Sequence, residues 1–229
     1  MPGDAPPPQV VAALARVGTA PDPRDLAVLT AAERRHADGL RDGVAAPFVA
    51  ARALLRRTLA QVAGVPRATV RLGVDPHGKL QPAGPLADWR CTVSHADGLA
   101  AVAVAHGVPV GVDVERVAGD AARRRRVLPS VLTPDEAAAV DAAGDADRLR
   151  TFLAIWTRKE AFLKGVGCGL TVEPRRVDAG HAGTRVRAAP AELEPGRWRL
   201  HELDAGPAHV GALAVAAPDA AVVLRPPEP

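Results

Sequence analysis

Two segments near the start of the chain place apolar residues at helical spacing. They cover 29–43 and 47–65, and the second begins after Pro47 and ends at Gly64, residues that favour helix starts and stops. Short runs rich in Val and Ala follow, separated by Pro and Gly, and these predict strands at 68–74, 89–95 and 99–106.

The rest of the chain repeats this order of helices and strands. Thr133, Pro134 and Glu136 have the spacing of a helix cap, and a longer helix is predicted from about Asp147 to Lys164. Further strands are expected at 108–117, 197–204 and 209–217. We therefore predict an α+β (α/β) fold of two similar halves that meet near residue 107, divided as 1–107 and 108–229.

Composition excludes some function classes. Three Phe, three Trp and no Tyr argue against a base-stacking platform for single-stranded nucleic acid, and no apolar run approaches membrane-spanning length. Residues 1–10 lack a secretion signal and are interpreted as a frayed tail. Cys91 and Cys168 have no metal-ligand spacing and are expected to be free thiols. We expect a cytoplasmic monomer that binds neither nucleic acid nor membranes.

One predicted strand carries paired carboxylates. In VGVDVERV, Val110, Val112 and Val114 point to one face, and Gly111, Asp113 and Glu115 point to the other. Two carboxylates on one face repel each other unless a cation lies between them, and Gly111 is expected to leave room for a ligand. Such oxygen ligands suit Mg²⁺. The alternative is the solvated polar face of an edge strand.

The long helix places a carboxylate among apolar residues. Glu160 falls within the stripe, and Lys164 lies one turn beyond it; the apolar members are Leu149, Phe152, Leu153, Trp156 and Leu163. An ionised carboxylate facing a core is costly unless it is paired or binds a metal. The alternative is a surface ion pair between Glu160 and Lys164. The following GVGCGL is interpreted as a helix stop and a tight turn.

Lysine is rare in this chain. Of 29 Lys and Arg residues, only Lys79, Lys159 and Lys164 are lysine. Lysine is a compact point charge that arginine does not replace at a tight site, so these positions indicate places where the chemistry requires an ammonium group. Lys159 is expected to lie on the edge of the helix.

Three further residues are candidate phosphate ligands. Ser94 and His95 are neighbours at the end of a strand, where they point to opposite faces and cannot form a nucleophile–base pair, but they suit a phosphate. Arg52 lies within the apolar stripe of its own helix, an unusual place for an arginine without an anionic partner.

These motifs together resemble a known family. GKL, VSH, GVDVERV, LTPDEAAAV and WTRKEAFLKGVGCGL occur in the order seen in Sfp-type 4′-phosphopantetheinyl transferases, and the resemblance spans Arg52 to Leu170. The chain departs from the family pattern at GKL, which lacks a proline, and at CTVSHA, where F-N-x-S-H-S is usual.

The resemblance implies a fold and a reaction. The two halves would be related by a pseudo-two-fold axis, with coenzyme A and Mg²⁺ bound in the cleft between them. The enzyme would transfer 4′-phosphopantetheine from coenzyme A, its co-substrate, to a serine of an apo acyl or peptidyl carrier protein, and would release adenosine 3′,5′-bisphosphate. Secondary metabolism is the expected context.

The resemblance also implies residue roles. Asp113, Glu115 and Glu160 would hold Mg²⁺ against the pyrophosphate of coenzyme A, and Lys164 would neutralise a phosphate of that group. Glu160 is the candidate base, directly or through a metal-bound water. The 3′-phosphate would meet Lys79, Ser94, His95 and Arg52, with His36 or Arg41 as substitutes from the first helix.

Two alternatives remain open from the residues alone. Paired acids with a nearby lysine also describe a Mg²⁺-dependent nuclease or phosphodiesterase. Arg123–Arg126 also fit the nucleic-acid patch of a binding module, or a solvated loop. Under the resemblance, these arginines and the apolar residues that follow are predicted to dock an acidic carrier protein.

Overall fold

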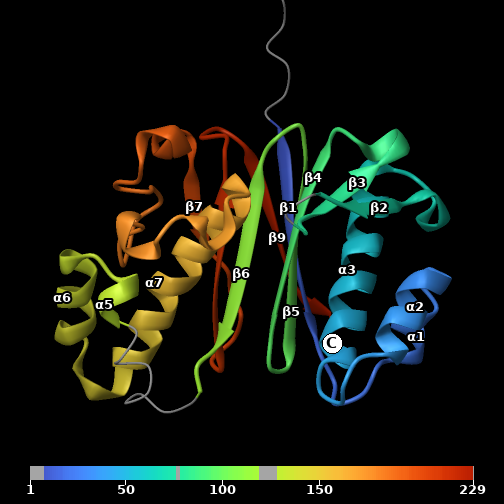
Figure 1. Ribbon diagram of the computed structural model, residues 1–229, viewed down its shortest axis with the longest axis horizontal. Coiled ribbons are helices and arrows are strands. Elements are labelled where there is room, and N and C mark those ends of the chain that lie inside the picture. The colour runs from blue at the N-terminus through green and yellow to red at the C-terminus, as the bar shows by residue number, and fades with distance from the viewer. Residues whose placement is uncertain (1–7, 76–77, 119–127, 229) are drawn as a thin grey trace, which may run out of the picture.

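Helices cover the two outer sides of a strand-rich centre in the computed structural model (Figure 1), which describes residues 8–75, 78–118 and 128–228. Arg123–Arg126 therefore lie outside the described residues. The helices are α1 (Pro23–Leu26), α2 (Ala31–Asp38), α3 (Ala45–Ala63), α5 (Leu128–Val131), α6 (Pro134–Ala142) and α7 (Gly144–Val166). The strands are β1 (Gln9–Arg16), β2 (Arg71–Val74), β3 (Leu80–Ala83), β4 (Trp89–Ala96), β5 (Leu99–His106), β6 (Val110–Arg116), β7 (Arg199–Glu202), β8 (His209–Val215) and β9 (Ala221–Glu228).

Two sheets pack face to face at the centre. One has the strand order β4-β5-β1-β9 and the other has the order β6-β8-β7, while β2 and β3 form a separate hairpin. The core between the sheets is built from small apolar side chains of β1, β5, β6 and β8, including Val10, Leu14, Val112 and Leu213. Val110, Val112 and Val114 all belong to this core, which confirms that these three residues share one face of the strand.

One long helix covers the outer face of each sheet. Leu55 and Leu59 of α3 pack on β1 and β5, and Ala161 and Phe162 of α7 pack on β7 and β8. The chain is thus a mixed α+β protein of four layers: helix, sheet, sheet, helix (Figure 1). Among the described residues, no helix combines the length and the apolar character needed to cross a membrane.

The helix caps follow the sequence signals. Thr133 and Glu136 form the predicted capping box at the start of α6, and α3 ends at Gly64, whose φ of 66° is left-handed. Gly167, with φ of 87°, ends α7, so the interpretation of GVGCGL as a helix stop is confirmed.

The interpretation of residues 1–10 as a tail is wrong at its end. Gln9 and Val10 begin strand β1, and Val10 is fully buried. β1 pairs with β5 on one side and with the C-terminal strand β9 on the other. The last strand of the chain therefore completes the sheet that the first strand begins.

The expectation that Gly111 leaves room for a ligand is also wrong, because helix α7 fills that space. A Cβ atom added to Gly111 would lie 1.8 Å from the Ala161 carbonyl oxygen and 2.5 Å from the Gly165 nitrogen. Gly165 is itself packed against Trp198, whose ring would lie 2.5 Å from an added Cβ. Strand β6 and helix α7 therefore meet backbone to backbone.

We predict that Gly111→Ala destabilises the protein by about 3 kcal/mol, the upper end of the usual cost of overpacking, because the clashing atoms are backbone and cannot rotate away. Urea denaturation followed by circular dichroism measures this. Gly73→Ala is the matched control, since its Cβ would meet nothing closer than the Gln81 carbonyl oxygen at 4.0 Å. Equal stability of the two variants would contradict the packing argument.

Candidate active site between the two sheets

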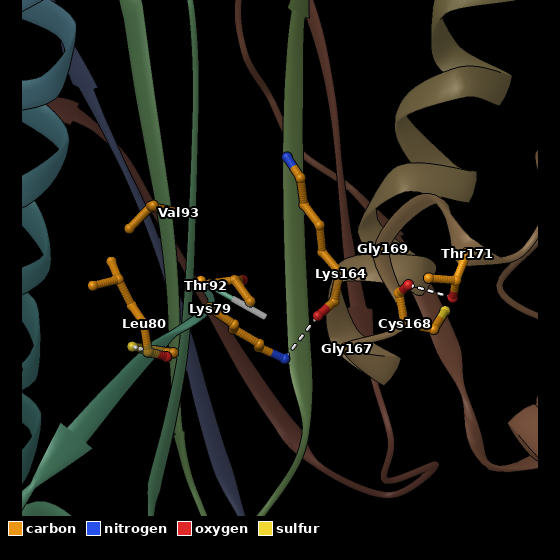
Figure 2. A pocket seen from close by; sticks show the side chains of 11 residues that line it. Lys79, Leu80, Thr92, Val93, Lys164, Gly167, Cys168, Gly169 and Thr171 are labelled. Atoms are coloured by element: carbon orange, nitrogen blue, oxygen red, sulfur yellow. Dashed lines mark hydrogen bonds between the residues drawn. The ribbon is translucent and has the colours of Figure 1, made fainter. Parts of the chain in front are cut away.

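A pocket of about 460 Å³ lies where the two halves of the chain meet (Figure 2). Its walls come from 78–80 and 91–93 on one side and from the end of α7 and the turn after it on the other. Lys79 reaches across, and its Nζ donates to the carbonyl oxygens of Lys164 and Gly165 at 2.7 and 3.2 Å. The Lys164 side chain points away from Lys79 (Figure 2).

Asp113 is held by residues from both halves. Its Oδ1 accepts from Ser94 Oγ of β4 at 2.8 Å and from Lys164 Nζ of α7 at 2.6 Å. The Asp113 side chain is 6% exposed, and its Oδ2 is buried with no hydrogen-bond partner among the described residues. A buried carboxylate oxygen without a partner is costly, so this atom is a candidate ligand for a cation.

Glu160 interacts with the charges of Asp113 and Lys164. Burial raises the pKa of Glu160 above its ordinary value of 4.5, the Asp113 and Glu115 carboxylates raise it further, and the Lys164 ammonium opposes them. Its Oε1 is a second buried carboxylate oxygen that has no hydrogen-bond partner in the part of the chain that the structure describes. Sequence reasoning placed Asp113, Glu160 and Lys164 together, and the structure brings them together.

Glu115 is oriented by a residue whose polar role the sequence did not reveal. Trp156 Nε1 donates to Glu115 Oε1 at 3.2 Å. The available signal was the spacing of Trp156, Glu160 and Lys164, four residues apart along one side of α7. Within the described part of the chain, no three acidic, histidine or cysteine side chains converge closely enough to hold a metal ion.

The residues present nevertheless fit Mg²⁺. This ion is usually bound by one or two carboxylates together with substrate phosphates, and not by a complete protein cage. Two unpartnered carboxylate oxygens, one on Asp113 and one on Glu160, match that requirement. Asp113, Glu115 and Glu160 carry more negative charge than Lys164 balances, so the site favours an added cation.

The candidate 3′-phosphate residues come from three places in the first half of the chain, namely α3, the residue before β3 and the end of β4. His95 is exposed at the end of β4, and its pKa is lowered first by partial burial of the ring and then by the Lys164 ammonium. Arg52 contacts Glu33 at 3.6 Å and stacks over Phe48. The structure therefore gives Arg52 an anionic partner from within the chain.

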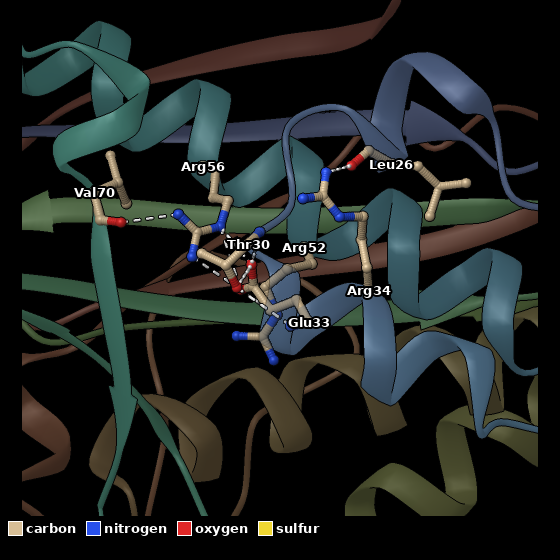
Figure 3. Close-up of polar contacts among 7 residues, drawn as sticks. All are labelled: Leu26, Thr30, Glu33, Arg34, Arg52, Arg56 and Val70. Carbon is tan, nitrogen blue, oxygen red and sulfur yellow. Dashed lines mark hydrogen bonds and ion pairs between the residues drawn. The ribbon is translucent and has the colours of Figure 1, made fainter.

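Glu33 is shared by two arginines (Figure 3). Buried Arg56 donates to both of its carboxylate oxygens and to the Val70 carbonyl oxygen, and this pairing lowers the pKa of Glu33 against the opposing effect of burial. His36 packs edge-on against Phe48, and Arg41 is exposed. Neither His36 nor Arg41 is among the described residues that line the pocket.

The sequence suggested that Lys159 lies on the edge of its helix, and this prediction is wrong. It is fully buried, and its Nζ pairs with Glu136 Oε2 at 2.6 Å. The ammonium also donates to the carbonyl oxygens of Pro174 and Val177. The contacts of Lys159 therefore hold α7 against α6 and against the segment that follows α7, so the role of Lys159 is structural.

Both cysteines are free thiols, as predicted. Cys91 and Cys168 line the pocket, yet burial raises the pKa of Cys91 to about 12 and also raises that of Cys168. A thiol reacts as its thiolate, so neither residue is suited to nucleophilic catalysis.

Comparison with known proteins gives a family match in the second half of the chain. Residues 109–215 match the family model described as the 4′-phosphopantetheinyl transferase superfamily. This match supports the superfamily. It covers β6, α7 and β8, and therefore Asp113, Glu115, Glu160 and Lys164, but not Lys79 or Ser94. A search of curated proteins found none that matches the chain.

The raised pKa of Glu160 predicts a pH dependence of stability. The folded state holds the Glu160 proton more tightly than the unfolded chain, so stability is lost as pH rises from 4.5 through the folded-state pKa. Glu160→Gln does not titrate. In EDTA it should be more stable than wild type at pH 7, by a margin that shrinks towards pH 4, as measured by urea denaturation. A less stable variant at pH 7 would contradict the assignment.

The buried pair predicts a second loss of stability. Lys159→Met leaves Glu136 buried and unpaired, which typically costs about 3–5 kcal/mol. Arg175→Met is the control, because it breaks an exposed pair with Glu173 and should cost about 0–1 kcal/mol. Thermal and urea denaturation compare the two. Similar losses of stability in the two variants would mean that the buried Lys159–Glu136 pair contributes no more than an exposed pair.

Proposed function

We propose that the protein transfers the 4′-phosphopantetheine group of coenzyme A to a serine of an apo acyl or peptidyl carrier protein, with Mg²⁺, and releases adenosine 3′,5′-bisphosphate. The observation that carries the proposal is the pair of unpartnered carboxylate oxygens beside Lys164, inside the segment that matches the superfamily. The motifs outside this segment support the Sfp type.

Asp113 and Glu160, with Glu115 beside them, would hold the metal ion. Bound Mg²⁺ would neutralise charge on the pyrophosphate of coenzyme A and so favour departure of the adenosine bisphosphate. A donor set of carboxylates without sulfur suits a hard cation of this kind.

Lys164 would act on the same phosphates. An ammonium has three N–H donors, and two of them are used by Asp113 Oδ1 and Ser94 Oγ. The third is available for a phosphate oxygen. Phosphoryl transfer depends mainly on positioning and charge neutralisation, and a lysine fixed at this place supplies both.

Glu160 would take the proton of the carrier serine. A carboxylate with a raised pKa is a better base than an ordinary one, and the pKa of Glu160 is raised by burial and by Asp113. The proton would move from the serine hydroxyl to a Glu160 carboxylate oxygen while the serine oxygen attacks the phosphorus.

Lys79 and His95 would contribute from the first half, together with Arg52, at the 3′-phosphate. The Lys79 ammonium has two carbonyl contacts and keeps one donor for an anion. Arg52 would have to share its guanidinium between Glu33 and the phosphate.

The test is incubation of the protein with coenzyme A, Mg²⁺ and an apo carrier, with the mass of the carrier measured afterwards. We expect a gain of one phosphopantetheine arm. Asp113→Ala should stay folded and lose about 10²- to 10⁴-fold in rate, the usual loss for an electrostatic or acid–base group. Asp219→Ala, an exposed acid in the turn before β9, should keep the wild-type rate.

A plasmid substrate in a parallel reaction tests the rival nuclease function. Absence of any mass gain with a panel of apo carriers, together with Mg²⁺-dependent cutting of the plasmid, would overturn the proposal. Normal transfer by folded Asp113→Ala would instead remove the metal assignment while leaving the reaction in place.

A further inference from the structure

Ser94 lies on β4 next to His95, and the two neighbours have different surroundings. Ser94 is 8% exposed and faces β6, whereas His95 is exposed. Successive side chains of a strand point to opposite faces, so a ligand that reaches one of them directly does not meet the other in the same way.

The hydrogen-bonding capacity of the Ser94 hydroxyl is already used. A hydroxyl has one donor and two acceptor lone pairs. Its proton goes to Asp113 Oδ1 at 2.8 Å, because an ionised carboxylate only accepts. Its lone pairs accept from Lys164 Nζ at 3.2 Å and from the backbone N–H of Val114 at 3.4 Å.

A phosphate oxygen would need that same proton. Phosphate oxygens accept hydrogen bonds, and the Ser94 hydroxyl has no second proton to donate. Direct binding of a 3′-phosphate by Ser94 would therefore leave Asp113 Oδ1 with Lys164 alone, in a buried position where a lost hydrogen bond is costly.

The effect on Asp113 is directional. Two donors, one from each half of the chain, fix Oδ1, and this leaves Oδ2 as the unpartnered oxygen. A carboxylate held through one oxygen presents the other in a fixed direction, as hydrogen-bonded ligands around metal sites generally do.

We propose that Ser94 is a positioning residue that orients Asp113 for the metal ion, and that it does not bind coenzyme A directly. This inference rests on the proposed function, because it assumes the metal site at Asp113. The two adjacent residues then have different roles: Ser94 orients the Asp113 carboxylate, and His95 contacts the anionic ligand.

The test measures metal binding without coenzyme A and without catalysis. Mn²⁺ serves as the probe, and its free concentration is followed by electron paramagnetic resonance. Ser94→Ala should weaken Mn²⁺ binding about 10- to 100-fold, the usual effect of removing a hydrogen bond to a metal ligand. Ser94→Cys, with a similar volume and a weak donor, should shift in the same direction.

Calorimetry with coenzyme A and its 3′-dephospho analogue gives the second readout. Ser94→Ala should keep the wild-type ratio of the two affinities, whereas His95→Ala should lower that ratio. Thr157→Val is the matched control for loss of a buried hydroxyl, since Thr157 Oγ1 donates only to the Ala154 carbonyl oxygen of its own helix. This control should retain wild-type Mn²⁺ affinity.

Asp113→Asn distinguishes a failure of the Ser94 role from a failure of the metal site. It should weaken Mn²⁺ binding, and adding Ser94→Ala to it should cause no further loss, because the two residues act as a unit. Weakened binding in Asp113→Asn with unchanged binding in Ser94→Ala would overturn the role of Ser94 alone. Unchanged binding in Asp113→Asn would overturn the metal site and the Ser94 inference together. A selective loss of the 3′-phosphate preference in Ser94→Ala would reassign Ser94 to coenzyme A.

Discussion

The backbone contact between β6 and α7 determines the geometry of the site. Gly111 allows the strand to touch Ala161 and Gly165 of the helix, and from there the two elements run side by side. Two residues of a strand advance about 6.6 Å, and four residues of a helix advance about 6 Å. The steps nearly match, so Asp113 meets Lys164 and Glu160, and Glu115 meets Trp156. The G-x-D-x-E spacing of the strand and the W-x-x-x-E-x-x-x-K spacing of the helix are two sides of one register.

The same helix carries three consecutive charged residues in three different environments. Arg158 donates to the backbone carbonyls of 179–183, and Lys159 pairs with Glu136. Glu160, 100° further round the helix, faces Asp113 and keeps an unpartnered oxygen. Buried charges are tolerated when they are paired, and this condition is met for the first two residues. The unpartnered oxygen of Glu160 separates it from Arg158 and Lys159, whose charged groups all have partners within the described residues.

Sequence reasoning predicted what local patterns encode. The caps at Thr133 and Gly64 and the shared face of Val110, Val112 and Val114 depend on neighbouring residues, and these predictions are confirmed. β1 was missed because VVAALA is continuously apolar, and such a run has neither strand nor helix periodicity. Long-range contacts were equally invisible: nothing near Lys159 reveals Glu136, and nothing near Gly111 reveals that a helix occupies its open side.

The site depends on both halves of the chain, although the family match covers only the second. The halves share a sheet through β1 and β9, and two polar links cross between them near α7. Lys79 donates to the last carbonyls of α7, where a cation also favours the negative end of the helix dipole, and Ser94 donates to Asp113. A shift of β4 relative to β6 would therefore turn the Asp113 carboxylate, and a shift of the 78–80 turn would release the end of the helix that bears Lys164. The first half consequently sets the orientation of groups in the second half before any ligand contacts them.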